Sequence, residues 1–189
     1  MKNIAVFASG SGTNAEAIVK HFEDSELARV AVIFCNRKSA GVIDRAHKLG
    51  VRCIIFSREQ LQSGWVLQKL RDNKIDFIAL AGFLLKVPDA LIEAFPQRIV
   101  NIHPALLPQY GGEGMYGMAV HEAVVENEEE ESGITIHYIN EDYDEGELIF
   151  QESVEIDFED TPADVQYKVR HLEHKHYPEV IEYLIKDLA

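Results

Sequence analysis

The feature of this sequence that most limits its fold is a regular alternation between short apolar runs and stretches with helical periodicity. Between the first two runs, Ala15, Ile18, Val19 and Phe22 recur at the spacing of one apolar helix face. Strands that alternate with helices form parallel sheets, because each helix returns the chain to the start of the next strand. The first half therefore predicts an α/β, doubly wound, mostly parallel sheet flanked by helices and Rossmann-like in its first half. Buried strands are expected over residues 4–8, 30–35, 53–56, 77–80 and 99–102.

Local signals predict where the helices begin and end. Thr13 and Glu16 have the spacing of a capping box at the start of the first helix. Thr161 followed by Pro162 predicts the start of a long closing helix, with an N-cap and a first-turn proline in their preferred positions. Other helices are expected over residues 40–49, 61–70, 88–95 and 120–125.

The second half has a different pattern. A glycine-rich segment, 111–117, precedes the helix at 120–125, and the acidic string 128–131 is expected to be a solvated turn. Strands are expected over 134–139 and 148–154, with a carboxylate-rich loop between them. No repeat or linker interrupts the chain, so residues 1–189 are expected to form one domain.

Composition excludes several classes of protein. The chain has 189 residues and a net charge of -14, from 18 Lys and Arg against 32 Asp and Glu, so a broad nucleic-acid or anionic-membrane surface is not expected. The longest apolar run, 77–85, is too short for a membrane helix. Cys35 and Cys53 lie within apolar runs and are interpreted as reduced core thiols. We expect a cytoplasmic protein, monomeric or weakly homodimeric.

A glycine-rich turn follows the first predicted strand. Gly10 and Gly12 precede a helix, and a helix N-terminus with close backbone approach can hold a phosphate. The turn could also carry no ligand. A third interpretation is a dinucleotide site, since Gly10, Gly12 and Ala15 fit the Rossmann spacing, and Arg37 after the second strand would suit NADP better than NAD.

Candidate acid–base residues follow later strands. Asn101 and His103 lie two apart at the end of the fifth strand, where ligands bind in doubly wound sheets, although a histidine that merely caps the strand is an equal alternative. Asp144 lies in the carboxylate-rich loop, most of which is expected to be solvated, and His137 lies on the preceding strand. If Asp144 contacts His103, it should raise the pKa of the imidazole and keep it charged near neutral pH.

Three histidines near the C-terminus suggest a metal site at first sight. His171, His174 and His176 lack an accompanying Cys or carboxylate pattern, so no metal is expected. Arg170 and Glu173 have the spacing of a surface ion pair on a helix.

Together these motifs resemble one known family. The ordered segments resemble the folate-dependent phosphoribosylglycinamide formyltransferases, the glycinamide ribonucleotide transformylases of purine synthesis, over nearly the whole length. They are residues 9–14 (Ser-Gly-Ser-Gly-Thr-Asn), 80–83 (Leu-Ala-Gly-Phe), 101–108 (Asn-Ile-His-Pro-Ala-Leu-Leu-Pro), 133–137 (Gly-Ile-Thr-Ile-His), Asp144 with Gly146, Glu173-His174, and Tyr177-Pro178. We therefore expect neither the RNA-binding domain of methionyl-tRNA formyltransferase nor the regulatory domain of formyltetrahydrofolate hydrolase.

The resemblance implies an activity and a set of site residues. The activity is transfer of the formyl group of 10-formyltetrahydrofolate, a cosubstrate, to the amine of glycinamide ribonucleotide, without a metal. Family roles fall on Asn101, His103 and Asp144 for catalysis, with His137 as an auxiliary residue. The ribonucleotide would contact Gly12, Thr13, Asn14, Arg170 and Glu173, and the folate would contact Leu80, Phe83, Leu84, Leu85, Glu141 and Asp142.

The sequence also departs from the family pattern. Leu85 stands where a basic residue is frequent, with Lys86 next to it, Gln109 replaces a frequent lysine, and Arg58 is the candidate for a mobile-loop arginine. The segment 110–117 is a variant of the usual loop. Two other classes remain as alternatives: an NADP-dependent reductase and a non-catalytic sensor of folate or nucleotide.

Overall fold

The computed structural model describes residues 1–140 and 144–188. Its centre is a seven-stranded sheet with the strand order β3-β2-β1-β4-β5-β6-β7. The first five strands of this order pair in parallel, and β6 and β7 join them antiparallel. The predicted doubly wound, mostly parallel sheet is therefore confirmed. The strands are β1 (Lys2–Ala8), β2 (Ala28–Cys35), β3 (Cys53–Ile55), β4 (Phe77–Leu80), β5 (Ile99–His103), β6 (Glu131–Tyr138) and β7 (Leu148–Glu155).

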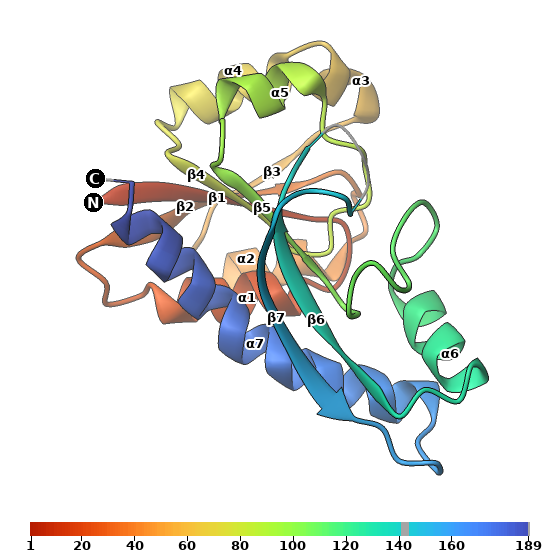
Figure 1. Cartoon of the computed structure of the whole chain (residues 1–189). Helices are drawn as coiled ribbons and strands as arrows, with labels where there is room; N and C mark the ends of the chain where they lie inside the picture. The colour runs from red at the N-terminus through yellow and green to blue at the C-terminus, as the bar shows by residue number, and fades with distance from the viewer. Residues whose placement is uncertain (141–143, 189) are drawn as a thin grey trace.

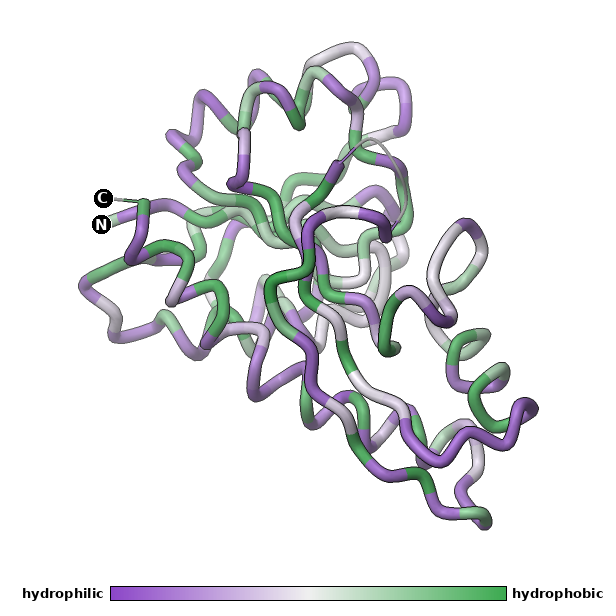
Figure 2. The backbone as a smooth tube through the Cα atoms, viewed as in Figure 1, coloured by the Kyte–Doolittle hydropathy of each residue, from purple (hydrophilic) through white to green (hydrophobic). Residues whose placement is uncertain are grey.

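Helices cover both faces of the sheet (Figure 1). Along β1, Ile4 and Val6 pack into one apolar cluster while Ala5 and Phe7 pack into the other, because successive side chains of a strand point to opposite faces. The cluster around Phe7 includes side chains of α3, α4 and α5, and the other includes those of α1, α2, α6 and α7. Figure 2 shows the hydrophobic strands between these layers. The helices are α1 (Thr13–His21), α2 (Gly41–Lys48), α3 (Arg58–Gln62), α4 (Trp65–Asp72), α5 (Asp89–Ala94), α6 (Met118–Glu126) and α7 (Pro162–Lys186).

Two predictions about helix ends are wrong, and one is confirmed. Gly12, not Thr13, is the N-cap of α1, and Glu16 pairs with Lys20 and Arg45 instead of closing a capping box. The helix predicted over 61–70 is two helices, α3 and α4, separated by Gly64 with a φ of 81°. Thr161 does cap α7, and its side chain accepts a hydrogen bond from Asp164 N.

The longest helix, α7, is hydrogen-bonded to the two strands that carry the site. Its Tyr177 is fully buried, and the hydroxyl lies 2.9 Å from the carbonyl oxygen of Leu80 and 3.0 Å from that of Val100. One side chain thus links α7 to the last residue of β4 and to the beginning of the adjacent strand β5.

Other expectations concern cysteines and membrane helices. Cys35 and Cys53 are free thiols, as predicted, and burial raises the pKa of both, that of Cys53 to about 11. Among the described residues, no helix is both long enough and apolar enough to cross a membrane.

Candidate active site

The candidate site lies where the strand order changes direction. From β1 the chain moves outward to β2 and β3, then returns to β4 and β5 on the other side of β1. Ligands of open α/β sheets bind beyond the carboxyl ends of the strands at such a point. The turns after β1 and β4 are hydrogen-bonded there: Ser9 N donates to Gly82 O at 3.0 Å, and Leu84 N donates to Ser9 Oγ at 3.0 Å. Pro104, directly after β5, lines the same cavity as Ser9 and Gly82.

Two cavities open at this edge of the sheet. We call the one of about 270 Å³ the Phe83 cavity and the one of about 250 Å³ the glycine-loop cavity. Both are lined by Gly82, Leu84 and Ile102, so they adjoin at the ends of β4 and β5. Two ligands could therefore meet beside β5.

The glycine loop is held against α2. Gly10 O accepts from Val42 N at 3.1 Å, and Ser11 O accepts from Arg45 Nε at 2.8 Å. Gly12 has a φ of 78°, and a Cβ atom there would overlap the side chain and the Cα of Val42. A glycine is therefore required at position 12 both for its conformation and for its contact with α2.

Polar side chains from three helices face the glycine-loop cavity. Its walls include Thr13 and Asn14 of α1, His121 of α6, and Arg170 and Glu173 of α7. The structure therefore places the predicted ribonucleotide residues Thr13, Asn14, Arg170 and Glu173 together in one cavity wall. The prediction that Arg170 and Glu173 form a surface ion pair is wrong, because both side chains line this cavity. Gly12, also predicted to contact the ribonucleotide, is the buried N-cap of α1 and is not among the residues that line the cavity.

Two of these groups have strongly shifted pKa values. Burial raises the pKa of Glu173 to about 7, although Asn14 donates a hydrogen bond to its carboxyl and Arg170 lies nearby. Burial and the charge of Arg170 lower the pKa of His121 to about 4. His121 Nδ1 and Asn14 Oδ1 are buried without hydrogen-bond partners in the described part of the chain. His121 was not among the site residues predicted from the sequence. Its position shortly after the glycine-rich segment was the only signal that it could belong to the site.

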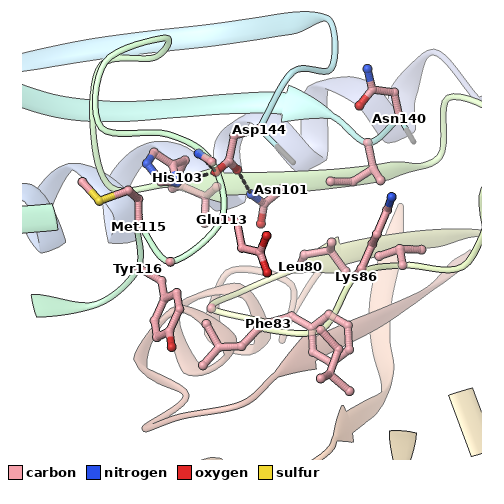
Figure 3. Close-up of a pocket in the computed structure, with 18 of the residues that line it drawn as sticks. Leu80, Phe83, Lys86, Asn101, His103, Glu113, Met115, Tyr116, Asn140 and Asp144 are labelled. Carbon is pink, nitrogen blue, oxygen red and sulfur yellow. Dashed lines mark hydrogen bonds and ion pairs between the residues drawn. The ribbon is translucent and has the colours of Figure 1, made fainter. Parts of the chain in front are cut away.

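The predicted catalytic trio comes together at the Phe83 cavity (Figure 3). Asp144 Oδ1 accepts from Asn101 Nδ2 at 3.4 Å, and Asp144 Oδ2 lies 3.4 Å from His103 Nδ1. Gly112 N also donates to Asp144 Oδ2, at 3.1 Å. On the other side of the ring, His103 Nε2 donates to Tyr110 O at 2.7 Å. The capping interpretation of His103 is therefore insufficient, because its ring faces a carboxylate within a cavity.

The charge states of the pair differ from the sequence prediction. His103 is only 4% exposed, and burial lowers its pKa more than Asp144 and the Tyr110 carbonyl raise it. The prediction that Asp144 keeps His103 charged near neutral pH is thus wrong, because desolvation disfavours the imidazolium. Burial also raises the pKa of Asp144, but His137, His103 and Gly112 N together hold it below the ordinary value. The pair is a neutral imidazole beside a carboxylate at neutral pH.

His137 supports the trio from β6, which pairs with β5. Its Nδ1 donates to Tyr138 O at 2.8 Å, so Nε2 can accept from Asn101 Nδ2 at 3.2 Å. Nε2 also lies 3.5 Å from Asp144 Oδ1. Gly146 permits this packing, because a Cβ atom there would overlap Tyr138 O.

Four of the six residues predicted to contact the folate belong to the described part of the chain, and they lie together. Leu80, Phe83, Leu84 and Leu85 all line the Phe83 cavity. Glu141 and Asp142 lie outside the described residues. The same cavity is lined by Arg58, the candidate for the mobile-loop arginine, and by Lys86, which follows Leu85. It is also lined by three residues that sequence reasoning did not assign to the site: Glu113, Met115 and Tyr116. The glycine-rich segment was the signal for these three.

The C-terminal histidines form no metal site. Among residues 1–140 and 144–188, no group of His, Cys, Asp and Glu could hold a metal ion. His171 Nδ1 instead donates to Tyr167 O at 2.8 Å, and His176 Nδ1 lies 3.4 Å from Glu179.

Comparison with known proteins agrees with this geometry. The family model described as "Formyl transferase" matches residues 2–181. The chain belongs to the formyl transferase family. Among the relatives of this formyl transferase, phosphoribosylglycinamide formyltransferase of Bacillus subtilis is 36% identical over 191 residues, covering 98% of this chain and 95% of that protein. The chloroplastic enzyme of the same name from Arabidopsis thaliana is 40% identical over 187 residues. That match covers 95% of this chain but 64% of the plant protein.

Solved structures extend the similarity to three dimensions. Glycinamide ribonucleotide transformylase 1 from Symbiobacterium toebii superposes on this formyl transferase with a TM-score of 0.90 and 31% identity, covering 99% of this chain and 89% of the other. The resemblance found in the sequence motifs is therefore confirmed. A family match of this extent does not support the NADP-reductase alternative.

Proposed function

We propose that this chain transfers a formyl group from 10-formyltetrahydrofolate to the amine of glycinamide ribonucleotide in purine biosynthesis, and that residues 1–189 act as one formyltransferase domain. The observation that carries the proposal is the pair of cavities that adjoin at Gly82, Leu84 and Ile102, beside the Asn101, His103 and Asp144 cluster. Transfer of a group between two substrates requires two binding sites that adjoin at the point where the group passes from one substrate to the other.

The glycine-loop cavity suits the ribonucleotide. The N-terminus of α1 offers free backbone N–H groups to a phosphate, beside Thr13 and Asn14. Arg37 and Arg170 add positive charge to the walls. Glu173, with a pKa of about 7, can exchange hydrogen bonds with ribose hydroxyls as either donor or acceptor.

The Phe83 cavity suits the folate. Its wall combines the apolar side chains of Leu80, Phe83 and Leu85 with the charged groups of Arg58 and Lys86. Apolar walls with a few polar groups are typical of sites for aromatic ligands. The two cations would face the carboxylates of the folate tail, which compensates for the loss of a basic residue at position 85.

The charge states favour a specific order of proton transfers. The amine attacks the formyl carbon, and Asn101 Nδ2 stabilises the oxyanion that forms by donating to it the N–H that faces Asp144 in the structure. The proton of the attached amine passes to His103 Nδ1, directly or through water, and the new imidazolium pairs with Asp144. The C–N10 bond then breaks as the proton passes to N10 of tetrahydrofolate. His137 keeps the Asn101 amide oriented. This sequence uses a neutral imidazole as acceptor, which agrees with a His103 pKa below its ordinary value.

An absorbance assay tests the proposal. The purified protein is mixed with 10-formyltetrahydrofolate and glycinamide ribonucleotide, and formation of tetrahydrofolate is followed with and without EDTA. We expect turnover that requires the ribonucleotide and is unchanged by EDTA. Binding of both ligands without turnover would favour a sensor, and activity lost in EDTA but restored by zinc would contradict the proposed metal-free chemistry.

A further inference from the structure

The Nε2 atom of His103 contacts the backbone of Tyr110, a residue to which the proposed function gives no role. His103 Nε2 donates to Tyr110 O at 2.7 Å. A carbonyl oxygen can only accept, so Nε2 carries the hydrogen and Nδ1, which faces Asp144, carries the lone pair of the neutral ring. The Tyr110 carbonyl thereby determines which nitrogen takes up a proton.

Tyr110 presents this carbonyl from an unusual backbone conformation. Its φ is 56°, in the left-handed region that side-chain-bearing residues rarely adopt. Such a conformation persists only where surrounding contacts fix it, and it is frequent at functional sites. The following glycines do not share the restriction, so the position of the carbonyl depends on what holds Tyr110.

The side chain of Tyr110 is fixed at the far end of α6. Its hydroxyl donates to Glu129 Oε1 at 2.6 Å and accepts from Asn127 Nδ2 at 3.0 Å. Glu129 is half-buried, while its neighbours Glu128 and Glu130 in the acidic string are exposed. The expectation that the whole string is a solvated turn is therefore wrong at Glu129, whose carboxylate faces the tyrosine, and at Glu131, which is the first residue of β6.

The same segment also contacts the partner of His103. Gly112 N donates to Asp144 Oδ2, the oxygen that faces His103 Nδ1. Residues 110–112 thus contact both members of the pair, one through a carbonyl and the other through an N–H. Movement of Tyr110 would change the orientation of both groups at once.

We propose that Tyr110 is a positioning residue that fixes the Nε2–H tautomer of His103, and that Glu129 and Asn127 hold it in place. The catalytic consequence rests on the proposed function, because it assumes that His103 Nδ1 receives the proton of the amine. When the hydroxyl anchor is removed, the imidazole remains buried but the two tautomers should both become populated. Only part of the protein then presents a free Nδ1 to the amine.

Substitutions on both sides of the anchor test this proposal. Tyr110→Phe and Glu129→Ala should each lower kcat about tenfold, a fraction of what a positioned proton-transfer group contributes, with both KM values within about twofold. Glu129→Gln keeps an oxygen that can accept and should retain most of the activity. The matched controls are Tyr183→Phe and Glu130→Gln, both at exposed positions outside the two cavities, which should leave kcat unchanged.

Nitrogen-15 NMR of the histidine rings separates positioning from a structural effect. The wild-type protein should show the Nε2–H tautomer of His103, and the two anchor variants should show a mixture. If Tyr110→Phe does not fold, the Glu129 variants decide the outcome. An unchanged tautomer in a folded anchor variant, with or without loss of kcat, would overturn the proposal. The tautomer is read without substrates, so absence of transfer by the wild-type protein would count against the proposed function alone.

Discussion

The imidazole of His103 is 4% exposed and lies 3.4 Å from the carboxylate of Asp144, so two opposing effects act on its pKa. Loss of hydration favours the neutral ring, and the carboxylate favours the charged ring. The first effect is larger, and the pKa lies below the ordinary value. A sequence shows that such a pair can form, but it does not show how completely the pair is buried, which is why the charge of His103 could not be predicted.

A titration of His103 by NMR checks this balance. We expect a midpoint below about 6.5, the ordinary value for histidine. The ring is neutral above its midpoint, so it can accept a proton at neutral pH and loses that ability as the pH falls through the midpoint. Asp144→Asn removes a contribution that raises the pKa, so its midpoint should be lower still. A wild-type midpoint above 6.5, or a midpoint that rises in Asp144→Asn, would contradict the assignment.

Two elements determine the geometry of the site: the loop between β1 and α1, and the helix α7. The loop was predictable from its glycines, as were the strands that flank it. Its N-cap was not predictable, because Thr13 and Glu16 have the spacing of a capping box while the close approach of Val42 places Gly12 at that position. Likewise, no sequence signal indicates that the Tyr177 hydroxyl donates to carbonyl groups of β4 and β5, 97 and 77 residues away.

The glycine loop offers a matched pair of substitutions. A Cβ atom at Gly10 would have no heavy atom within 4 Å, whereas one at Gly12 would overlap Val42. Gly10→Ala should change stability by less than about 1 kcal/mol and raise the KM for the ribonucleotide but not for the folate. Gly12→Ala should destabilise the protein by about 1–3 kcal/mol, as measured by urea unfolding. Equal changes in both KM values for Gly10→Ala would argue against a phosphate at this loop.

Tyr177→Phe tests the role of α7. The substitution removes a hydroxyl that shares its hydrogen between two buried carbonyl groups. We expect a loss of about 1–2 kcal/mol in the free energy of unfolding, from the broken hydrogen bond and the oxygens left without it. Tyr183→Phe, at a 64% exposed position on the same helix, should change stability by less than about 0.5 kcal/mol. Equal effects of the two substitutions would show that the buried hydroxyl is not a specific contact.

On the scale of the whole molecule, the order of the strands brings the site together. The alternation of strands and helices predicted the parallel part of the sheet. The family motifs predicted the cavity residues of the glycine loop and of the ends of β4 and β5. The contacts of Tyr110, Glu129 and Asn127 could not be predicted, because they join a variant loop to the end of α6 through side chains alone. The family resemblance implied roles for residues of the shared motifs, but it implied none for Tyr110, Asn127 or Glu129.

We propose that Asn101, His103 and Asp144 perform the transfer between two separate binding cavities. The most direct test measures turnover and ribonucleotide binding for Asp144→Asn, with His103→Ala beside it. Turnover should fall by roughly a hundredfold or more in both, the scale of a lost proton-transfer or oxyanion group. Ribonucleotide affinity, measured by calorimetry, should stay within about threefold of the wild type, because the glycine-loop cavity does not include either side chain. Near-normal turnover by Asp144→Asn, or loss of ribonucleotide binding by a folded variant, would contradict these catalytic roles.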